Sequence, residues 1–180
     1  MRAALAVLVG CSLWGATAQA QPYVTSERVE AWTPIASIPG ITNLTDQTFS
    51  SEDEGRFTVT LPFGFSFVGA TVNDVTVSVN GVVALGASLP GFSNRALGGA
   101  STPNEFIALW WDDLVVNGVA GNAQTGVYGT APNRVFVIEV RGLERFSLSG
   151  MPELQWQLRL FEGAIGTFEA SLNGTATKNY

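Results

Sequence analysis

The sequence predicts an all-β protein, an antiparallel β-sandwich of jelly-roll type with little or no helix. Short segments alternate between apolar and polar residues, as half-buried strands do. The 180 residues include 20 glycines and are 46% hydrophobic but only 13% charged, which suits short buried strands joined by tight turns. No segment keeps helical periodicity over three turns. The length predicts one domain with a substantial core.

The first segment, residues 1–20, is expected to be a secretory signal peptide. Arg2 precedes an apolar run, and Ala18-Gln19-Ala20 has the small residues that flank a signal-peptidase cleavage site. The run is too short to span a bilayer, and no later stretch is continuously apolar over that length, so no transmembrane span is expected. The alternative is a lipoprotein anchored through Cys11, because Leu8-Val9-Gly10-Cys11 resembles a lipobox.

The second segment, residues 21–54, is polar and contains prolines at 22, 34 and 39. Proline cannot donate to a sheet ladder, so any strands here are expected to be short and to lie at a sheet edge. The sandwich domain proper is expected over residues 55–180. The chain reaches Tyr180 without an obvious closing turn, which leaves open whether a final strand is missing.

Within residues 55–180, period-two alternation marks the expected strands, and Asn80-Gly81 is the expected turn of a hairpin. Residues 134–140 are apolar on both faces apart from Glu139, which predicts a central strand. Residues 86–104 and 117–126 are rich in glycine and are expected to be loops. The expected strands cover residues 57–61, 63–67, 75–79, 82–85, 106–116, 134–140, 154–161 and 165–172.

Composition excludes several classes of function. The chain has no histidine, and its single cysteine is Cys11, so it lacks the residues for Ser-His-Asp or Cys-His catalysis and for imidazole or thiolate zinc sites. The net charge is −6 and the basic residues are scattered, which argues against nucleic acid as a partner. Glu139 and Glu162 could serve glycosidase chemistry, but cross-strand partners such as Arg141 or Arg159 are expected to satisfy them. No catalysis is expected.

Four runs of residues carry a resemblance to a known family. They are LPFGFSFVGATVNDVTVSVNGVVALG, IALWWDDL, GVYGTAPNRVFVIEV and LQWQLRLFEGAIGTFEASL. Their order resembles that of bacterial extracellular β-sandwich modules that are similar to the nidogen-like extracellular domain of adhesion proteins. The positions that fall on the pattern are Phe63, Phe65, Asn80, Gly81, Trp111, Asp113, Leu114, Leu160, Glu162 and Ile165. The resemblance implies an extracellular module and provides no catalytic residues.

The stretch Trp110-Trp111-Asp112-Asp113 allows three interpretations. In a regular strand, neighbouring side chains point to opposite faces, so Trp111 is expected in the core and the aspartates in a turn, where they accept backbone N–H bonds. Asp112, Asp113 and Asn117 could instead bind Ca²⁺, and no other cofactor is expected. Trp110 with Asp112 could bind a sugar by stacking and hydrogen bonding.

The sequence therefore predicts an exported, non-catalytic module with a structural or adhesive role, secreted or at the cell surface. Its expected partners are a protein or an extracellular polysaccharide, and the oligomeric state is left open. Two alternatives remain: a carbohydrate-binding module that uses Trp110, and an accessory domain of a secreted hydrolase.

Overall fold

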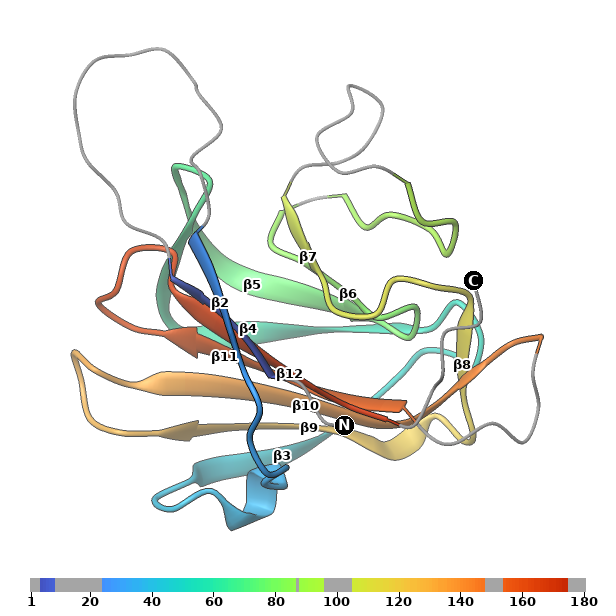
Figure 1. The fold of residues 1–180 in the computed structure, drawn as a ribbon, viewed down its shortest axis with the longest axis horizontal. Coiled ribbons are helices and arrows are strands. Elements are labelled where there is room, and N and C mark those ends of the chain that lie inside the picture. Colours follow the sequence, from blue (N-terminus) through green and yellow to red (C-terminus); the bar gives the residue numbers. More distant parts are fainter. Residues whose placement is uncertain (1–3, 9–23, 87, 96–104, 148–153, 175–180) are drawn as a thin grey trace.

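The protein is a sandwich of two antiparallel sheets (Figure 1). The computed structural model describes residues 4–8, 24–86, 88–95, 105–147 and 154–174. Every strand pair in these residues is antiparallel, and the one helical element among them is the short 3-10 turn η1 (Ile35–Ser37). The predicted all-β sandwich is confirmed. None of the described residues forms a helix long and apolar enough to cross a membrane.

The larger sheet has the strand order β2-β1-β12-β11-β10-β9-β3, and β8 pairs with one end of β10. The smaller sheet has the order β4-β5-β6-β7. The strands of the larger sheet are β1 (Ala4–Leu8), β2 (Val24–Arg28), β3 (Thr42–Thr48), β8 (Leu114–Val116), β9 (Ala120–Tyr128), β10 (Val135–Arg145), β11 (Leu154–Phe161) and β12 (Phe168–Asn173). The strands of the smaller sheet are β4 (Arg56–Phe67), β5 (Ala70–Ser78), β6 (Val82–Ala84) and β7 (Phe106–Ala108).

The core lies between the two sheets, and β4 shows how the sequence builds it. Phe57, Leu61, Phe63, Phe65 and Phe67 alternate with outward-facing residues, and all five side chains are buried. The facing surface comes from the central strands of the larger sheet, whose buried residues include Ile138, Leu158, Leu160 and Trp156. Burying one such side chain contributes about 1.5–3 kcal/mol, so the buried side chains of β4 alone supply a large part of the free energy that stabilises the sandwich.

Two expectations about strands are wrong. Residues 106–116 do not form one strand, because β7 and β8 belong to different sheets and residues 109–113 turn between them. Residues 117–126 are not simply a loop, because β9 occupies most of them and pairs with both β10 and β3. Small residues hide this strand from a periodicity argument. A Cβ added at Gly126 would lie 2.9 Å from the end of the Ile41 side chain, which would have to move to make room for it.

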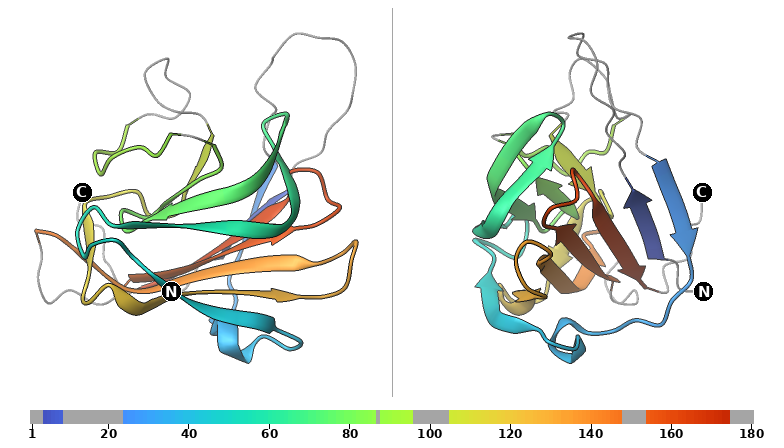
Figure 2. Two further views of the ribbon diagram at one scale, coloured as in Figure 1. Left: turned by 180° about the vertical axis from the view of Figure 1, so that it is seen from behind. Right: turned by 90° about the vertical axis from the view of Figure 1, so that its left-hand side faces the viewer.

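The N-terminal segment supplies both edges of the larger sheet, β2 and β3 (Figure 2). The strand β1 lies between β2 and β12, within the residues expected to be a signal peptide. Removal of that peptide stays a prediction. Cys11 lies outside the described residues.

Candidate functional site

Three loop segments meet at the right-hand end of the sandwich in Figure 1, and we call this place the Asn80 corner. They are residues 51–55 between β3 and β4, residues 79–81 between β5 and β6, and residues 109–113 between β7 and β8. Backbone hydrogen bonds join them, since Val79 N donates to Gly55 O (2.9 Å) and Leu109 N donates to Gly81 O (2.9 Å). Two motifs of the sequence resemblance, Asn-Gly and Trp-Trp-Asp-Asp, are therefore hydrogen-bonded to each other.

Asn80 is the buried centre of this corner. Its Oδ1 accepts from Leu114 N (3.0 Å), and its Nδ2 donates to Glu54 Oε2 (3.2 Å). Its backbone N donates to Ser78 Oγ (3.1 Å) and its backbone O accepts from Asp112 N (3.4 Å). A single side chain thus joins the loop before β4 to the first residue of β8, which explains why a neutral residue with both a donor and an acceptor stands here.

Gly81 has no room for a side chain. Its φ is +72°, in the left-handed region, and a Cβ would lie 2.5 Å from the carbonyl oxygen of Trp110. Both facts require glycine. The hairpin predicted at Asn80-Gly81 is present, since β5 pairs with β6, but the connection spans three residues and only Gly81 has a positive φ.

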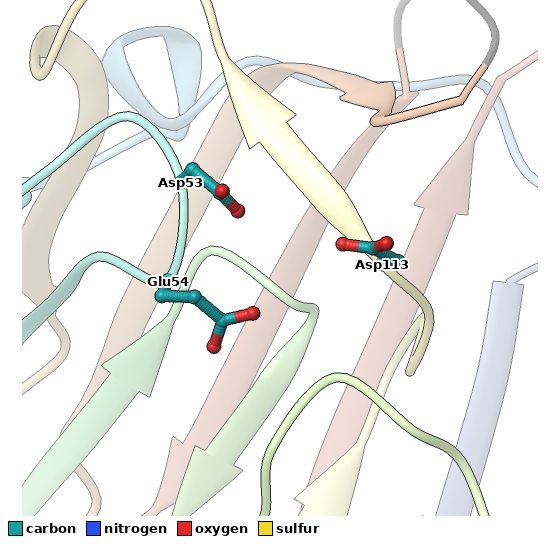
Figure 3. Close-up of side chains that lie close together, drawn as sticks. All are labelled: Asp53, Glu54 and Asp113. Atoms are coloured by element: carbon teal, nitrogen blue, oxygen red, sulfur yellow. The ribbon is translucent and has the colours of Figure 1, made fainter.

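Three carboxylates gather on the surface of the Asn80 corner, and we call Asp53, Glu54 and Asp113 the acidic cluster (Figure 3). Each offers an oxygen, and these oxygens all lie within 4.8 Å of one another. Asp53 and Glu54 are exposed and Asp113 is half-buried. Carboxylate oxygens at such spacing are the ligand type that Ca²⁺ takes, so this group could hold a divalent cation.

The residues expected to bind calcium or sugar lie in different surroundings. Asp113 belongs to the acidic cluster, whereas the Asp112 carboxylate accepts from Asp113 N (3.0 Å) and pairs with Arg145 (2.9 Å). Asn117 is exposed, and its carbonyl accepts from Asn122 Nδ2 (3.2 Å). Sequence reasoning missed Asp53 and Glu54 because they are far from Asp113 along the chain. The only available signal was the acidic run at residues 52–54.

The two tryptophans pack in places that simple alternation does not predict. Trp110 is half-buried against the main core. Trp111 packs instead on the outer side of the smaller sheet, where its ring meets Phe106 edge-on at 5.2 Å and its Nε1 donates to Gly91 O (2.7 Å). The expectation that Trp111 belongs to the core between the sheets is wrong, because the chain leaves the strand at residue 109 and strand alternation ends there.

A second buried polar group lies on the outer face of the larger sheet, and we call Glu139, Gln157, Thr33 and Ile35 the Glu139 patch. Glu139 is fully buried, and its Oε2 accepts from Ile35 N (2.9 Å) and from Gln157 Nε2 (2.6 Å). The same Gln157 amide donates to Thr33 O (2.6 Å). Arg141 lies 3.5 Å from Glu139, but both residues belong to β10, so the expected cross-strand pairing is wrong. These contacts hold the N-terminal segment across the sheet.

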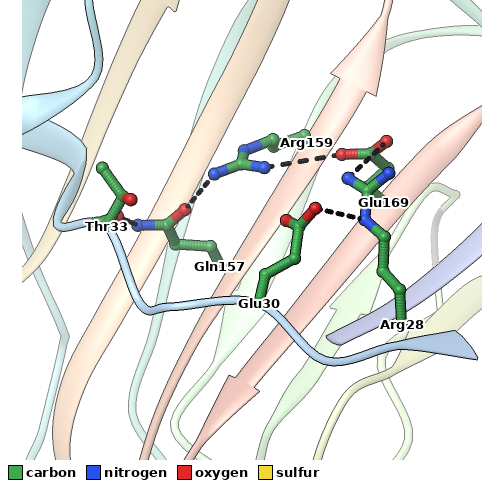
Figure 4. Close-up of polar contacts among 6 residues, drawn as sticks. All are labelled: Arg28, Glu30, Thr33, Gln157, Arg159 and Glu169. Carbon is green, nitrogen blue, oxygen red and sulfur yellow. Dashed lines mark hydrogen bonds and ion pairs between the residues drawn. The ribbon is translucent and has the colours of Figure 1, made fainter. Parts of the chain in front are cut away.

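The polar contacts continue toward the edge of the sheet (Figure 4). Arg159 donates to Gln157 Oε1 (3.0 Å) and reaches Glu169 on β12 (3.4 Å). Arg28 on β2 reaches the same Glu169 (3.4 Å) and pairs with Glu30 (2.8 Å). The N-terminal segment is therefore held both at Gln157 and at Glu169.

At the end of the sandwich opposite the Asn80 corner, Arg134 and Glu162 form a two-pronged ion pair. Arg134 Nε and Nη2 donate to the two oxygens of Glu162, each at 2.7 Å, and Arg134 N also donates to Glu162 Oε2 (3.1 Å). The hydrogen bonds from Arg134 hold the pKa of Glu162 below its ordinary value of 4.5. The guanidinium also lies over the Phe63 ring at 5.5 Å. Glu162 therefore stabilises the turns at this end of the sandwich, and its partner is Arg134 rather than the expected Arg159.

One comparison with known proteins finds a match. A family model described as NIDO related matches residues 22–178 of the chain. Neither a curated protein nor a solved structure matches it. The match covers most of the chain and, among the strands of the described residues, includes all except β1.

Proposed function

The chain belongs to the NIDO-related family of extracellular modules, and on that ground we propose that it is an exported, non-catalytic module with a structural or adhesive role. The observation that carries the proposal is the family match over residues 22–178. The match begins just after the predicted cleavage site at Ala20, as a domain preceded by a signal peptide would. The module would reach the cell surface or the medium, and its partner would be a protein.

The Asn80 corner supports a structural role for the stretch that most resembles a binding site. Asp112 is engaged by Arg145, and Trp110 packs against the main core. A sugar-stacking platform needs an accessible ring, which a residue packed in this way supplies poorly. These contacts favour the structural module over the alternative of a carbohydrate-binding module. The alternative of a hydrolase accessory domain depends on a catalytic partner encoded beside this chain.

The direct test of export is the intact mass of the chain after expression in a bacterium with a general secretion pathway. A protein outside the cytoplasm that begins at Gln21 is the expected result. A lipid adduct on Cys11 would replace this proposal with the lipoprotein alternative, and a full-length product that stays in the cytoplasm would overturn it.

Binding classes are separated by thermal melts of the exported protein against a panel of polysaccharides. A ligand that binds only the folded state raises the melting temperature, so the non-catalytic structural module should show no shift. A shift that disappears in Trp110→Ala, with the fold retained, would instead support the carbohydrate-binding alternative.

Calcium binding remains a proposal within this function, and the ligands to test are Asp113 together with Asp53 and Glu54. We expect millimolar calcium to raise the melting temperature relative to EDTA, and Asp113→Asn to abolish the rise. The matched control is Asp46→Asn, an exposed carboxylate on β3, which should keep it. An equal rise in both variants, or none in the unmodified protein, would contradict a cation at the acidic cluster.

A further inference from the structure

The strand β1 fills a place in the larger sheet between two strands of the matched domain. Its residues pair with β12 in the register Ala4↔Ser171, Leu5↔Ala170, Ala6↔Glu169 and Val7↔Phe168. On its other side it pairs with β2 over Ala4–Leu8. Figure 2 shows β1 and β2 beside β12 at this edge of the sandwich. The place is one strand wide and accepts an antiparallel strand.

Two independent observations separate β1 from the domain. The sequence predicts cleavage after Ala20, and the family match begins at residue 22. The neighbours of β1 on both sides, β2 and β12, lie inside the match. Cleavage would therefore remove β1 from a sheet that keeps both flanking strands.

The exported chain would then present β12 as an open edge. An edge strand offers a row of unpaired backbone N–H and C=O groups, which are a template for another strand. On the inner side of this edge lie Phe168 and Ala170, which are buried in the structure that contains β1. Losing β1 would open the backbone groups to solvent and reduce the cover over these two side chains.

The segment β2 is poorly placed to close this edge. Since β1 runs antiparallel to both neighbours, β2 runs parallel to β12, and direct pairing would create a parallel ladder in an antiparallel sheet. Arg28 already holds β2 beside the edge through Glu169 (3.4 Å). Only residues 21–23 would precede β2 in the cleaved chain, too few to return as a strand.

We infer that the edge of β12, once the signal peptide is removed, accepts an extended segment of a partner protein as an added antiparallel strand. This inference rests on the proposed export of the chain. The segment that the structure seats there, ALAVL, defines the chemistry of the partner. It has large apolar residues at the positions opposite Ala170 and Phe168 and small residues at the positions opposite Ser171 and Glu169. Backbone pairing would supply the affinity, and this alternation the specificity.

The test uses the exported protein carrying Ser171→Cys. After loss of residues 1–20 the protein has no other thiol, because Cys11 is the only cysteine. Ser171 is half-buried and faces Ala4 in the register, at a separation that a cross-strand disulfide can span. The probe is the peptide ALAVL between lysine pairs, with a cysteine in place of its first alanine. The control peptide has the cysteine in place of the first leucine, so its thiol points to the other face.

Each peptide carries its cysteine as a disulfide with 2-thiopyridine, so the thiolate introduced by Ser171→Cys displaces thiopyridone and the mixed disulfide forms by exchange without an added oxidant. We expect this exchange to be about tenfold faster with the probe than with the control peptide, because strand pairing holds the thiolate beside the peptide disulfide. Excess cysteine-free peptide should slow this reaction. Equal rates would overturn the inference. The inference would also fail if the introduced thiol is shielded without peptide, which would mean that β2 closes the edge. A dimer through this edge would overturn it as well, because a second copy would then occupy the place.

The mass of the exported protein distinguishes a failure of the proposed function from a failure of the strand-acceptor inference. If residues 1–20 remain attached, the proposed function fails on export, and the site is filled by the chain itself. If they are absent and the peptide is not captured, only the strand-acceptor inference fails.

Discussion

Asn80 and Glu139 are both buried polar residues, and each attaches a segment outside the regular strands to a sheet. Asn80 attaches the turn at residues 109–113 and the loop at residues 51–55 at one end of the sandwich. Glu139 attaches the N-terminal segment to the outer face of the larger sheet through Ile35 N. The two places differ in charge. The buried group of the Asn80 corner is neutral and its carboxylates face solvent, whereas the Glu139 patch buries a carboxylate.

This difference in charge predicts which substitutions weaken each attachment. A neutral amide that uses both a donor and an acceptor leaves two segments unsatisfied when it is removed. A buried carboxylate carries a desolvation cost of its own, so a neutral residue of the same shape can replace it with little loss. The Asn80 corner should therefore be sensitive to shape, and the Glu139 patch should tolerate loss of charge but not loss of the acceptor.

The largest expected effect comes from Gly81→Ala. The new Cβ would meet the Trp110 carbonyl oxygen at 2.5 Å in a left-handed conformation, and we expect a loss of about 4 kcal/mol in the free energy of unfolding. The control is Gly118→Ala, which has a φ of +88° but no atom within 4 Å of the new Cβ and should cost about 1–2 kcal/mol. Urea denaturation measures both. Equal losses would mean that the steric contact with the Trp110 carbonyl oxygen adds nothing to the cost of the Gly81→Ala substitution.

The next effect is that of Asn80→Ala, which should cost about 3 kcal/mol. It removes a hydrogen bond to the Glu54 carboxylate and leaves Leu114 N unpaired in the interior. Asn94→Ala is the control, because this exposed amide makes one bond of 3.3 Å to Trp111 O and should change stability by about 0.5 kcal/mol at most. Chemical denaturation of the two variants measures the free energy of unfolding that each loses. Similar values would remove the reason for treating Asn80 as the centre of the corner.

At the Glu139 patch, two substitutions of the same residue separate the loss of charge from the loss of the hydrogen-bond acceptor. Glu139→Gln keeps an oxygen for Ile35 N and removes the buried charge, so we expect a change of about 1 kcal/mol or less. Glu139→Ala removes the acceptor and should cost about 2–3 kcal/mol. Hydrogen exchange at Ile35 N should speed up in the alanine variant alone. If glutamine is as harmful as alanine, the charge and its contact with Arg141 are needed, and the contrast with Asn80 disappears.

The smallest effect concerns the opposite end of the sandwich and depends on pH. Arg134 lowers the pKa of Glu162, so this pair stabilises the folded state fully above about pH 4.5 and loses its contribution as the pH falls through the lowered value. Glu162→Gln should therefore lower the melting temperature at pH 7, and the difference from the unmodified protein should shrink toward pH 3. Melts across this range measure it. A difference that is independent of pH would assign the effect to packing rather than to charge.

The β-sandwich could be predicted from the sequence because strand alternation is a local property. The alternating apolar side chains of β4 and β11 face inward wherever these strands are placed, so the fold class follows from their order. The strand β9 escaped this reasoning because it is rich in small and polar residues, and its place in the sheet is shown only by its backbone pairing with β3 and β10.

The residues that make up the sites could not be predicted, because they are brought together by tertiary contacts. The acidic cluster forms because Asn80 hydrogen-bonds to two segments that are far apart in the chain, at Glu54 and at Leu114. Glu162 pairs with Arg134 rather than Arg159 because the two turns at that end meet. The periodicity of the sequence cannot predict such contacts, because they depend on which strands become neighbours. The packing of the whole domain decides which strands do.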